Sequence, residues 1–141
     1  MIIKQLSVFM ENKSGRLTGV LEVLGKENLR ITALSVADAN EFGILRLILP
    51  DPDTAKRLLK ENSYTVNVTE VISVVVPDEA KHYAGILKIL SDLDISVEYT
   101  YAFSRAGKSI IILKCNDNNR AITALKDNEM KLLRAGDLYE I

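Results

Sequence analysis

The feature that most constrains this chain is an internal repeat. A shift of 66 residues places Leu21 on Leu87 and aligns the two halves of the chain without a gap. The shift pairs identical residues along the chain: Val8 with Val74, Gly19 with Gly85, Leu24 with Leu90, Ile44 with Ile110, Asp51 with Asp117, Ala55 with Ala121 and Lys60 with Lys126. Self-similarity at a fixed period indicates two copies of one structural unit. The 141 residues are therefore expected to form two units, 1–70 and 71–141, with a boundary near Glu70. Residues 65–76 can run almost straight from the last strand of one unit into the first strand of the next.

Each copy has the pattern of a βαββαβ unit. Leu17, Val20, Leu21 and Leu24 recur at the spacing of one helical face, and Tyr83, Ile86, Leu87 and Leu90 copy that spacing in the second half. The elements expected in the first copy are a strand over 3–10, a helix over 16–27, strands over 30–38 and 44–49, a helix that starts at 50–53, and a strand over 65–70. The order predicts an α+β fold of two ferredoxin-like units, each an antiparallel four-stranded sheet with two helices on one face. A unit of this size buries too little surface to be very stable alone, so the two units should pack together.

Composition excludes several classes of function. The net charge of −1 does not suit a nucleic-acid or anionic membrane surface, which needs a basic excess. Cys115 and His82 are the only cysteine and histidine, so neither an internal disulfide nor a usual zinc site can form. The start lacks a signal-peptide pattern, and no apolar run approaches the roughly 20 residues that span a bilayer. We expect a cytoplasmic protein without metal, cofactor or catalytic residues.

The segment between the first strand and the first helix carries the most distinctive chemistry. It reads Glu11-Asn12-Lys13-Ser14-Gly15-Arg16-Leu17. Gly15 permits a tight turn, and free backbone N–H groups at a helix start can hold a carboxylate. The Asn12 amide can both donate and accept hydrogen bonds. These groups suit a zwitterion, although ordinary helix entry with Ser14 as the N-cap explains the same residues.

The βαββαβ order together with Glu-Asn-x-x-Gly-x-Leu at 11–17 resembles the ACT domain family, over the whole chain as two tandem units. The motif is similar to that of the serine-sensing regulatory domain of phosphoglycerate dehydrogenase. The resemblance implies two units joined edge to edge as one eight-stranded sheet, with strands 30–38 and 96–104 at the seam. It also implies a free amino acid bound at that seam, and a regulated metabolic enzyme or regulator that is a separate chain. A homo-oligomer is compatible with it, whereas nucleic acid and membrane are not expected partners.

The resemblance designates a set of ligand-binding residues. They are Met10, Glu11, Asn12, Lys13, Ser14, Gly15, Arg16, Leu17, Arg30, Asp78, Glu79, Glu98, Tyr99 and Tyr101. Tyr99 and Tyr101 alternate on one face of a strand, and core packing under the helices is their alternative role.

Two departures from the family pattern bear on the ligand. Ser14 replaces the usual proline before the glycine, and Arg30 stands where the serine sensor has asparagine, which puts serine itself in question. The second copy has 78–81 as Asp-Glu-Ala-Lys, so Lys81 replaces the glycine. A carboxylate should prefer the first loop, which adds fewer acids to the helix start, although an acid of the second loop could meet the ammonium. Two equal sites remain the alternative.

Three other proteins of this element order fit less well. An RNA-recognition domain needs aromatic and basic residues on its sheet, but aromatics are 6% of the chain and the charge is acidic. A ferredoxin-like metal chaperone needs paired cysteines. An acylphosphatase-like enzyme could use Arg16, but the predicted second strand has no asparagine. An interaction module without a ligand stays open beside the sensor.

Overall fold

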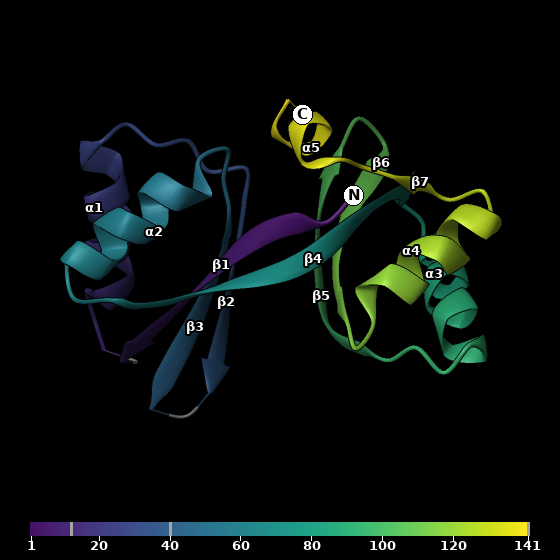
Figure 1. The fold of residues 1–141 in the computed structure, drawn as a ribbon, viewed down its shortest axis with the longest axis horizontal. Helices are drawn as coiled ribbons and strands as arrows, with labels where there is room; N and C mark the ends of the chain where they lie inside the picture. Colours follow the sequence, from purple (N-terminus) through teal and green to yellow (C-terminus); the bar gives the residue numbers. More distant parts are fainter. Residues whose placement is uncertain (12, 40, 141) are drawn as a thin grey trace. The chain divides into compact units, whose positions relative to one another are not determined.

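The computed structural model describes residues 1–11, 13–39 and 41–140. The elements run in the order β1 (Ile3–Glu11), α1 (Arg16–Lys26), β2 (Ala33–Ala39), β3 (Phe42–Ile48), α2 (Pro52–Glu61), β4 (Thr65–Pro77), α3 (Ala80–Asp92), β5 (Val97–Arg105), β6 (Lys108–Cys115), α4 (Asn118–Asp127), β7 (Lys131–Leu132) and α5 (Ala135–Tyr139) (Figure 1). The chain divides into two compact units, an N-terminal unit of residues 4–69 and a C-terminal unit of residues 1–3 and 70–140.

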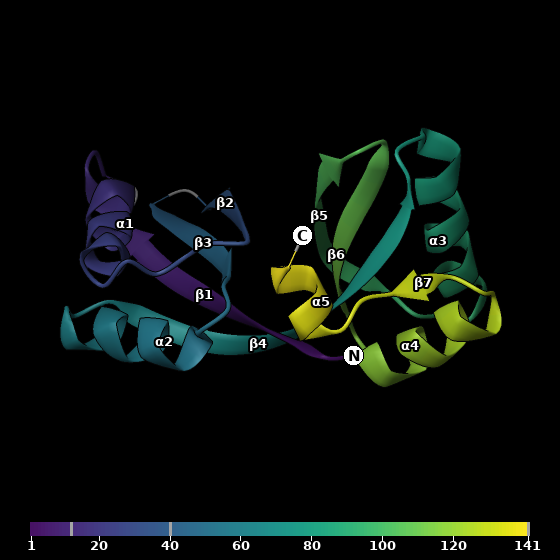
Figure 2. The same ribbon diagram turned by 90° about the horizontal axis from the view of Figure 1, so that it is seen from above.

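The two units have the same topology. The strands of the N-terminal unit lie in the order β2-β3-β1-β4, and those of the C-terminal unit in the order β5-β6-β4-β7. In each unit two helices cover one face of the sheet, α1 and α2 in the first and α3 and α4 in the second (Figure 2). The predicted α+β fold of two βαββαβ units is confirmed.

The repeat extends to single backbone features. Helices α2 and α4 start and end at equivalent residues, and the Asp51 and Asp117 carboxylates cap them by accepting from the N–H groups of Thr54 and Arg120. The residues that leave the regular helical conformation after a helix are equivalent as well: Asn28 with Asp94, and Ser63 with Glu129, all with positive φ. The same local sequence signals therefore produce the same turns twice.

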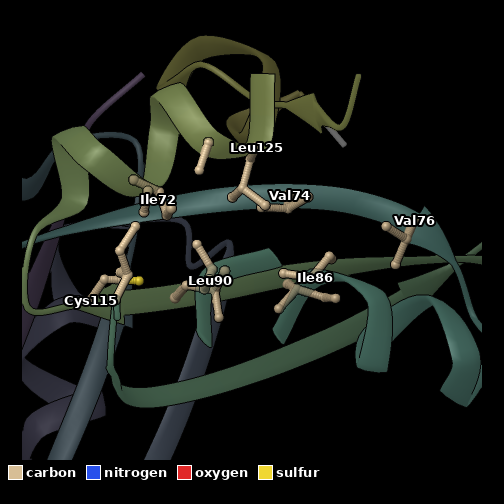
Figure 3. Packing of buried hydrophobic residues seen from close by; sticks show 12 residues of the cluster. Ile72, Val74, Val76, Ile86, Leu90, Cys115 and Leu125 are labelled. Carbon is tan, nitrogen blue, oxygen red and sulfur yellow. The ribbon is translucent and has the colours of Figure 1, made fainter. Parts of the chain in front are cut away.

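Each unit has its own hydrophobic core between the sheet and its helices. In the C-terminal unit, Ile72, Val74 and Val76 alternate along β4 and face α3 and α4, with Leu90 of α3 among the side chains that they meet (Figure 3). Cys115 lies in the same core and has no exposed surface. A fully buried Leu, Ile or Val contributes about 1.5–3 kcal/mol relative to the exposed side chain, so each core stabilises the position of the loops around it.

Strand β4 is continuous, as expected for residues 65–76, which can run almost straight from one copy into the next. Residues 65–77 form one strand of 13 residues whose first part belongs to the N-terminal unit and whose second part belongs to the C-terminal unit. The expected eight strands are therefore seven among the described residues. In the second copy, the residues equivalent to 65–66 at the start of β4 form the two-residue strand β7.

The seam expected between residues 30–38 and 96–104 stays a prediction. Among the described residues β2 pairs with β3 and β5 pairs with β6, and the strand order leaves β2 and β5 as end strands.

The chain termini carry two features that the periodicity did not predict. Residues 1–3 belong to the C-terminal unit, where Ile2 packs against the core and Ile3 has no exposed surface. The short helix α5 follows β7 and lies on the side of the strands opposite α3 and α4 (Figures 1 and 2). Leu138 of α5 is fully buried, so apolar burial holds this short helix in place.

Candidate functional site

The predicted loop 11–17 borders a pocket that lies entirely within the N-terminal unit. The pocket has a volume of about 160 Å³ and is formed where the end of β1 and the start of α1 meet β2 and β3. Its lining residues are Met10, Glu11, Lys13, Arg16, Leu17, Val36, Asp38 and Gly43. Five of these eight residues were predicted from the sequence.

The strand register places the floor of this pocket. Met10 lies opposite Gly43, and Gly43 lies opposite Asp38, so these three residues form one row across β1, β3 and β2. Residues directly opposite one another on antiparallel strands share a face of the sheet. This row faces α1 and α2, because Met10 belongs to the core that those helices cover.

The start of α1 is built by backbone geometry rather than by a side-chain cap. The N-cap is Gly15, with φ of 86° and no side-chain hydrogen bond, so the alternative prediction of Ser14 as the cap is wrong. The loop bonds to itself, with the Lys13 N–H donating to the Glu11 carbonyl (2.8 Å) and the Arg16 N–H donating to the Lys13 carbonyl (3.2 Å). The positive φ explains the glycine, because residues with a Cβ rarely adopt it. Asn12 lies outside the described residues.

The rim of the pocket carries charges of both signs. The Lys13 Nζ lies 2.9 Å from the Glu11 Oε2, and the hydrogen bond from Lys13 and its charge hold the pKa of the Glu11 carboxyl below its usual value. Arg16 places its guanidinium 5.9 Å from the centre of the Tyr64 ring, a cation–π contact at the start of α1. The first turn of α1 has no acidic residue. The rim can therefore meet a carboxylate and an ammonium at the same time.

The second copy repeats the loop but not its chemistry. The Glu79 N–H donates to the Pro77 carbonyl and the His82 N–H to the Glu79 carbonyl, which are the counterparts of the two loop bonds of the first copy. Helix α3 nevertheless begins at Ala80, two residues earlier than the counterpart of the α1 start, because Lys81 replaces the glycine. The Lys81 Nζ lies 3.7 Å from Glu79 Oε2.

The comparison with protein families decides the class of the molecule. The family description that matches is the ACT domain pair, over residues 1–141. The chain belongs to the ACT domain pair family. The resemblance inferred from loop 11–17 and the repeat is confirmed. A comparison with curated proteins found no match.

Several solved structures are similar to this chain. A protein from Bacteroides thetaiotaomicron is 42% identical, with a TM-score of 0.95 over 100% of this chain and 98% of that one. The ligand-free regulatory subunit of aspartate kinase from Thermus thermophilus is 11% identical, with a TM-score of 0.65 over 88% of this chain and 91% of the subunit. The corresponding subunit from Thermus flavus is also 11% identical, with a TM-score of 0.64 over 89% of this chain and 92% of that subunit. At 11% identity the two Thermus structures show the shared fold.

Several predicted residues of this ACT domain pair are not among those that line the pocket. Arg30 is exposed in the segment between α1 and β2 and does not line it. In the C-terminal unit the Asp78 N–H donates to Gly107, at the turn between β5 and β6. Glu98 instead pairs with Lys114 (3.1 Å), near the start of β5 and the end of β6. The predicted residues of the second copy therefore do not gather at one place within their unit.

Tyr99 and Tyr101 lie on the sheet face that points away from α3 and α4. Tyr101 is opposite Ile112, whereas the neighbours Ile111 and Leu113 belong to the core beneath the helices. An irregularity between Val97 and Tyr99 shifts the alternation of β5. The alternative prediction that the two tyrosines pack under the helices is therefore wrong.

The sequence did not designate Val36, Asp38 and Gly43, although all three line the pocket. Leu34, Val36 and Asp38 alternate along the strand and so share one of its faces, but the register with β3 was needed to bring Asp38 beside Gly43.

Within the described ranges no helix is long and apolar enough to cross a membrane. The same ranges contain no group of three His, Cys, Asp or Glu side chains placed to hold a metal ion.

Proposed function

We propose that this ACT domain pair is a non-catalytic regulatory protein that senses a free α-amino acid in the pocket beside loop 11–17. The observation that carries the proposal is the rim of that pocket, where Lys13 and Arg16 stand with Glu11 and Asp38 around a small hollow. An α-amino acid presents one carboxylate and one ammonium on the same carbon, and few other small metabolites need both charges within so small a space.

The geometry supports one orientation of the zwitterion. The carboxylate binds at the start of α1, where the backbone N–H groups, the helix dipole and Arg16 all favour an anion. The ammonium binds toward the Asp38 carboxylate on β2. A volume of about 160 Å³ is roughly half of the lower limit for drug-sized ligands, which supports a ligand of few atoms.

The same reasoning supports one principal site in each chain. The counterparts of Arg16 and Asp38 in the C-terminal unit are His82 and Ser104, and the counterpart of Glu11 is Pro77. The second copy thus lacks the carboxylates and the guanidinium at the equivalent positions. A weaker second site, or none, is the expected result of a titration.

We propose that the sensor regulates a separate enzyme or regulator of amino-acid metabolism in the cytoplasm. The Thermus thermophilus protein of the same fold is described as a regulatory subunit of aspartate kinase. That description supports an arrangement in which an ACT pair acts on another chain. A ligand can regulate such a partner when it binds two conformations or two assembly states of the sensor with different affinity.

A thermal-shift screen of the twenty amino acids tests the proposal. A ligand at 100 times its Kd adds about 2.7 kcal/mol of stability, which corresponds to a rise in Tm of about 5–10 °C for a chain of this size. Arg16→Gln should remove most of the shift. Arg57→Gln is the matched control, because Arg57 pairs with Glu61 on the exposed face of α2, away from the pocket.

Two results would contradict the sensor. If no amino acid shifts the Tm and calorimetry detects no heat, the chain acts as an interaction module without a ligand. If a ligand binds but Arg16→Gln and Arg57→Gln bind it as tightly as the unmodified protein does, the ligand occupies another place. Size measurement with and without the ligand shows in the same samples whether copies of the chain associate.

A further inference from the structure

Gly43 lines the pocket beside loop 11–17 and brings no side chain into it. Gly43 occupies the middle of the row formed with Met10 and Asp38, on the sheet face that α1 covers. Two residues further along β3, Leu45 lies on the same face, and its fully buried side chain belongs to the core under the helices. Gly43 has no side chain to fill the corresponding space, which is part of the pocket.

We infer that Gly43 sets the depth of this pocket and thereby selects an amino acid with a small apolar side chain. This inference rests on the proposed function. The walls below the charged rim are apolar, from Met10, Leu17 and Val36. With the α-carboxylate at the start of α1 and the α-ammonium on Asp38, the side chain of the ligand points toward Gly43 and Met10, where a second charged or amide group would lose water beside apolar side chains.

The space at Gly43 can hold a methyl group. A Cβ added there would lie 3.5 Å from the Met10 Cε and 3.8 Å from the Ala37 carbonyl oxygen, both ordinary van der Waals distances. An alanine can therefore fit without moving the strands. The methyl group would instead occupy volume that the side chain of the ligand uses.

The second copy shows the filled form of the same place. The counterpart of Gly43 is Ser109, which lies between Val76 and Ser104 in the equivalent row and is 2% exposed. The counterpart of Leu17 is Tyr83, which packs against the core of its unit. The fold therefore accepts a side chain at both positions, and the first copy is hollow because of its residues rather than because of its backbone.

Calorimetry with glycine, alanine, valine, leucine, phenylalanine and glutamate tests the inference on the full chain. The unmodified protein should bind one of the small apolar amino acids best and glutamate and phenylalanine least. Gly43→Ala should lower the affinity for that best ligand by about 10- to 200-fold, the range for one methylene in an apolar pocket. The affinity for the next smaller amino acid should change less, so the order of preference shifts toward smaller side chains. Gly25→Ala is the control, because a Cβ at Gly25 on α1 meets no atom within 4 Å, and it should leave the order unchanged.

A second variant keeps the test independent of how Gly43→Ala folds. Leu17→Tyr fills the hollow from the helix side, as Tyr83 does in the other copy, and should shift the preference in the same direction. If the unmodified protein binds no amino acid, the proposed function itself fails. If it binds one but prefers a large or charged side chain, or if both variants lower all affinities by one common factor, the sensor stands and Gly43 does not set its selectivity.

Discussion

Gly19 and Gly85 occupy equivalent positions in α1 and α3, and they should respond differently to the same substitution. A Cβ at Gly19 would lie 2.6 Å from the Tyr64 Oη, whereas a Cβ at Gly85 would meet no atom within 4 Å. The difference has a clear origin, because the counterpart of Tyr64 in the second copy is Met130. The pair therefore compares one substitution with and without a steric conflict.

The expected magnitudes follow from helix propensity and packing. Replacing glycine by alanine inside a helix contributes about 0.8–1.0 kcal/mol, so Gly85→Ala should raise the free energy of unfolding by about that amount. At Gly19 this gain is offset in part or in full, because the Oη at the far end of the half-buried Tyr64 side chain must move. Gly19→Ala should therefore stabilise the protein less than Gly85→Ala does, by up to about 1 kcal/mol.

Urea unfolding followed by circular dichroism measures both effects, provided that the m-value stays constant. Tyr64→Phe provides the decisive background, because it removes the Oη and leaves the Cζ at 3.9 Å from the added Cβ, an ordinary contact. In that background Gly19→Ala should become as stabilising as Gly85→Ala. The reasoning is refuted if Gly19→Ala already stabilises the unmodified protein by about 1 kcal/mol, or if Tyr64→Phe leaves its effect unchanged.

Three further predictions concern single groups. The hydrogen bond from Thr54 holds the pKa of the Asp51 carboxyl below its usual value, so its contribution to stability is present above the ordinary carboxyl range and is lost as the pH falls through the lowered pKa; Asp51→Asn should remove this part of the acid dependence of unfolding. Because Lys13 is the main cause of the low pKa of Glu11, Lys13→Ala should raise that pKa toward 4.5 in an NMR titration, and an unchanged value would show that the ion pair does not persist in solution. Burial raises the pKa of the Cys115 thiol, so a thiol-specific reagent should modify it in urea but not in the native protein.

The sequence determined most of the elements and their repetition, because the signals are local. The aspartates at 51 and 117 cap the second helix of each copy, and the prediction of a helix start at 50–53 needed nothing beyond those neighbours. The same holds for Gly15, whose position after the first strand predicted a tight turn and whose φ is positive. A shift of 66 residues then transferred each of these features from one half of the chain to the other.

Tertiary structure decided which residues share a site, because strand register is set by packing between segments far apart in sequence. Asp38 and Gly43 join Met10 through two pairings that no local pattern specifies, whereas Arg30 lies outside the pocket although it precedes the same strand. The face of Tyr101 depended on an irregularity in β5 that alternation alone cannot predict. The sequence by itself thus determined two copies of one unit with a distinctive loop, and the register of β1, β2 and β3 turned the first loop into one side of a pocket.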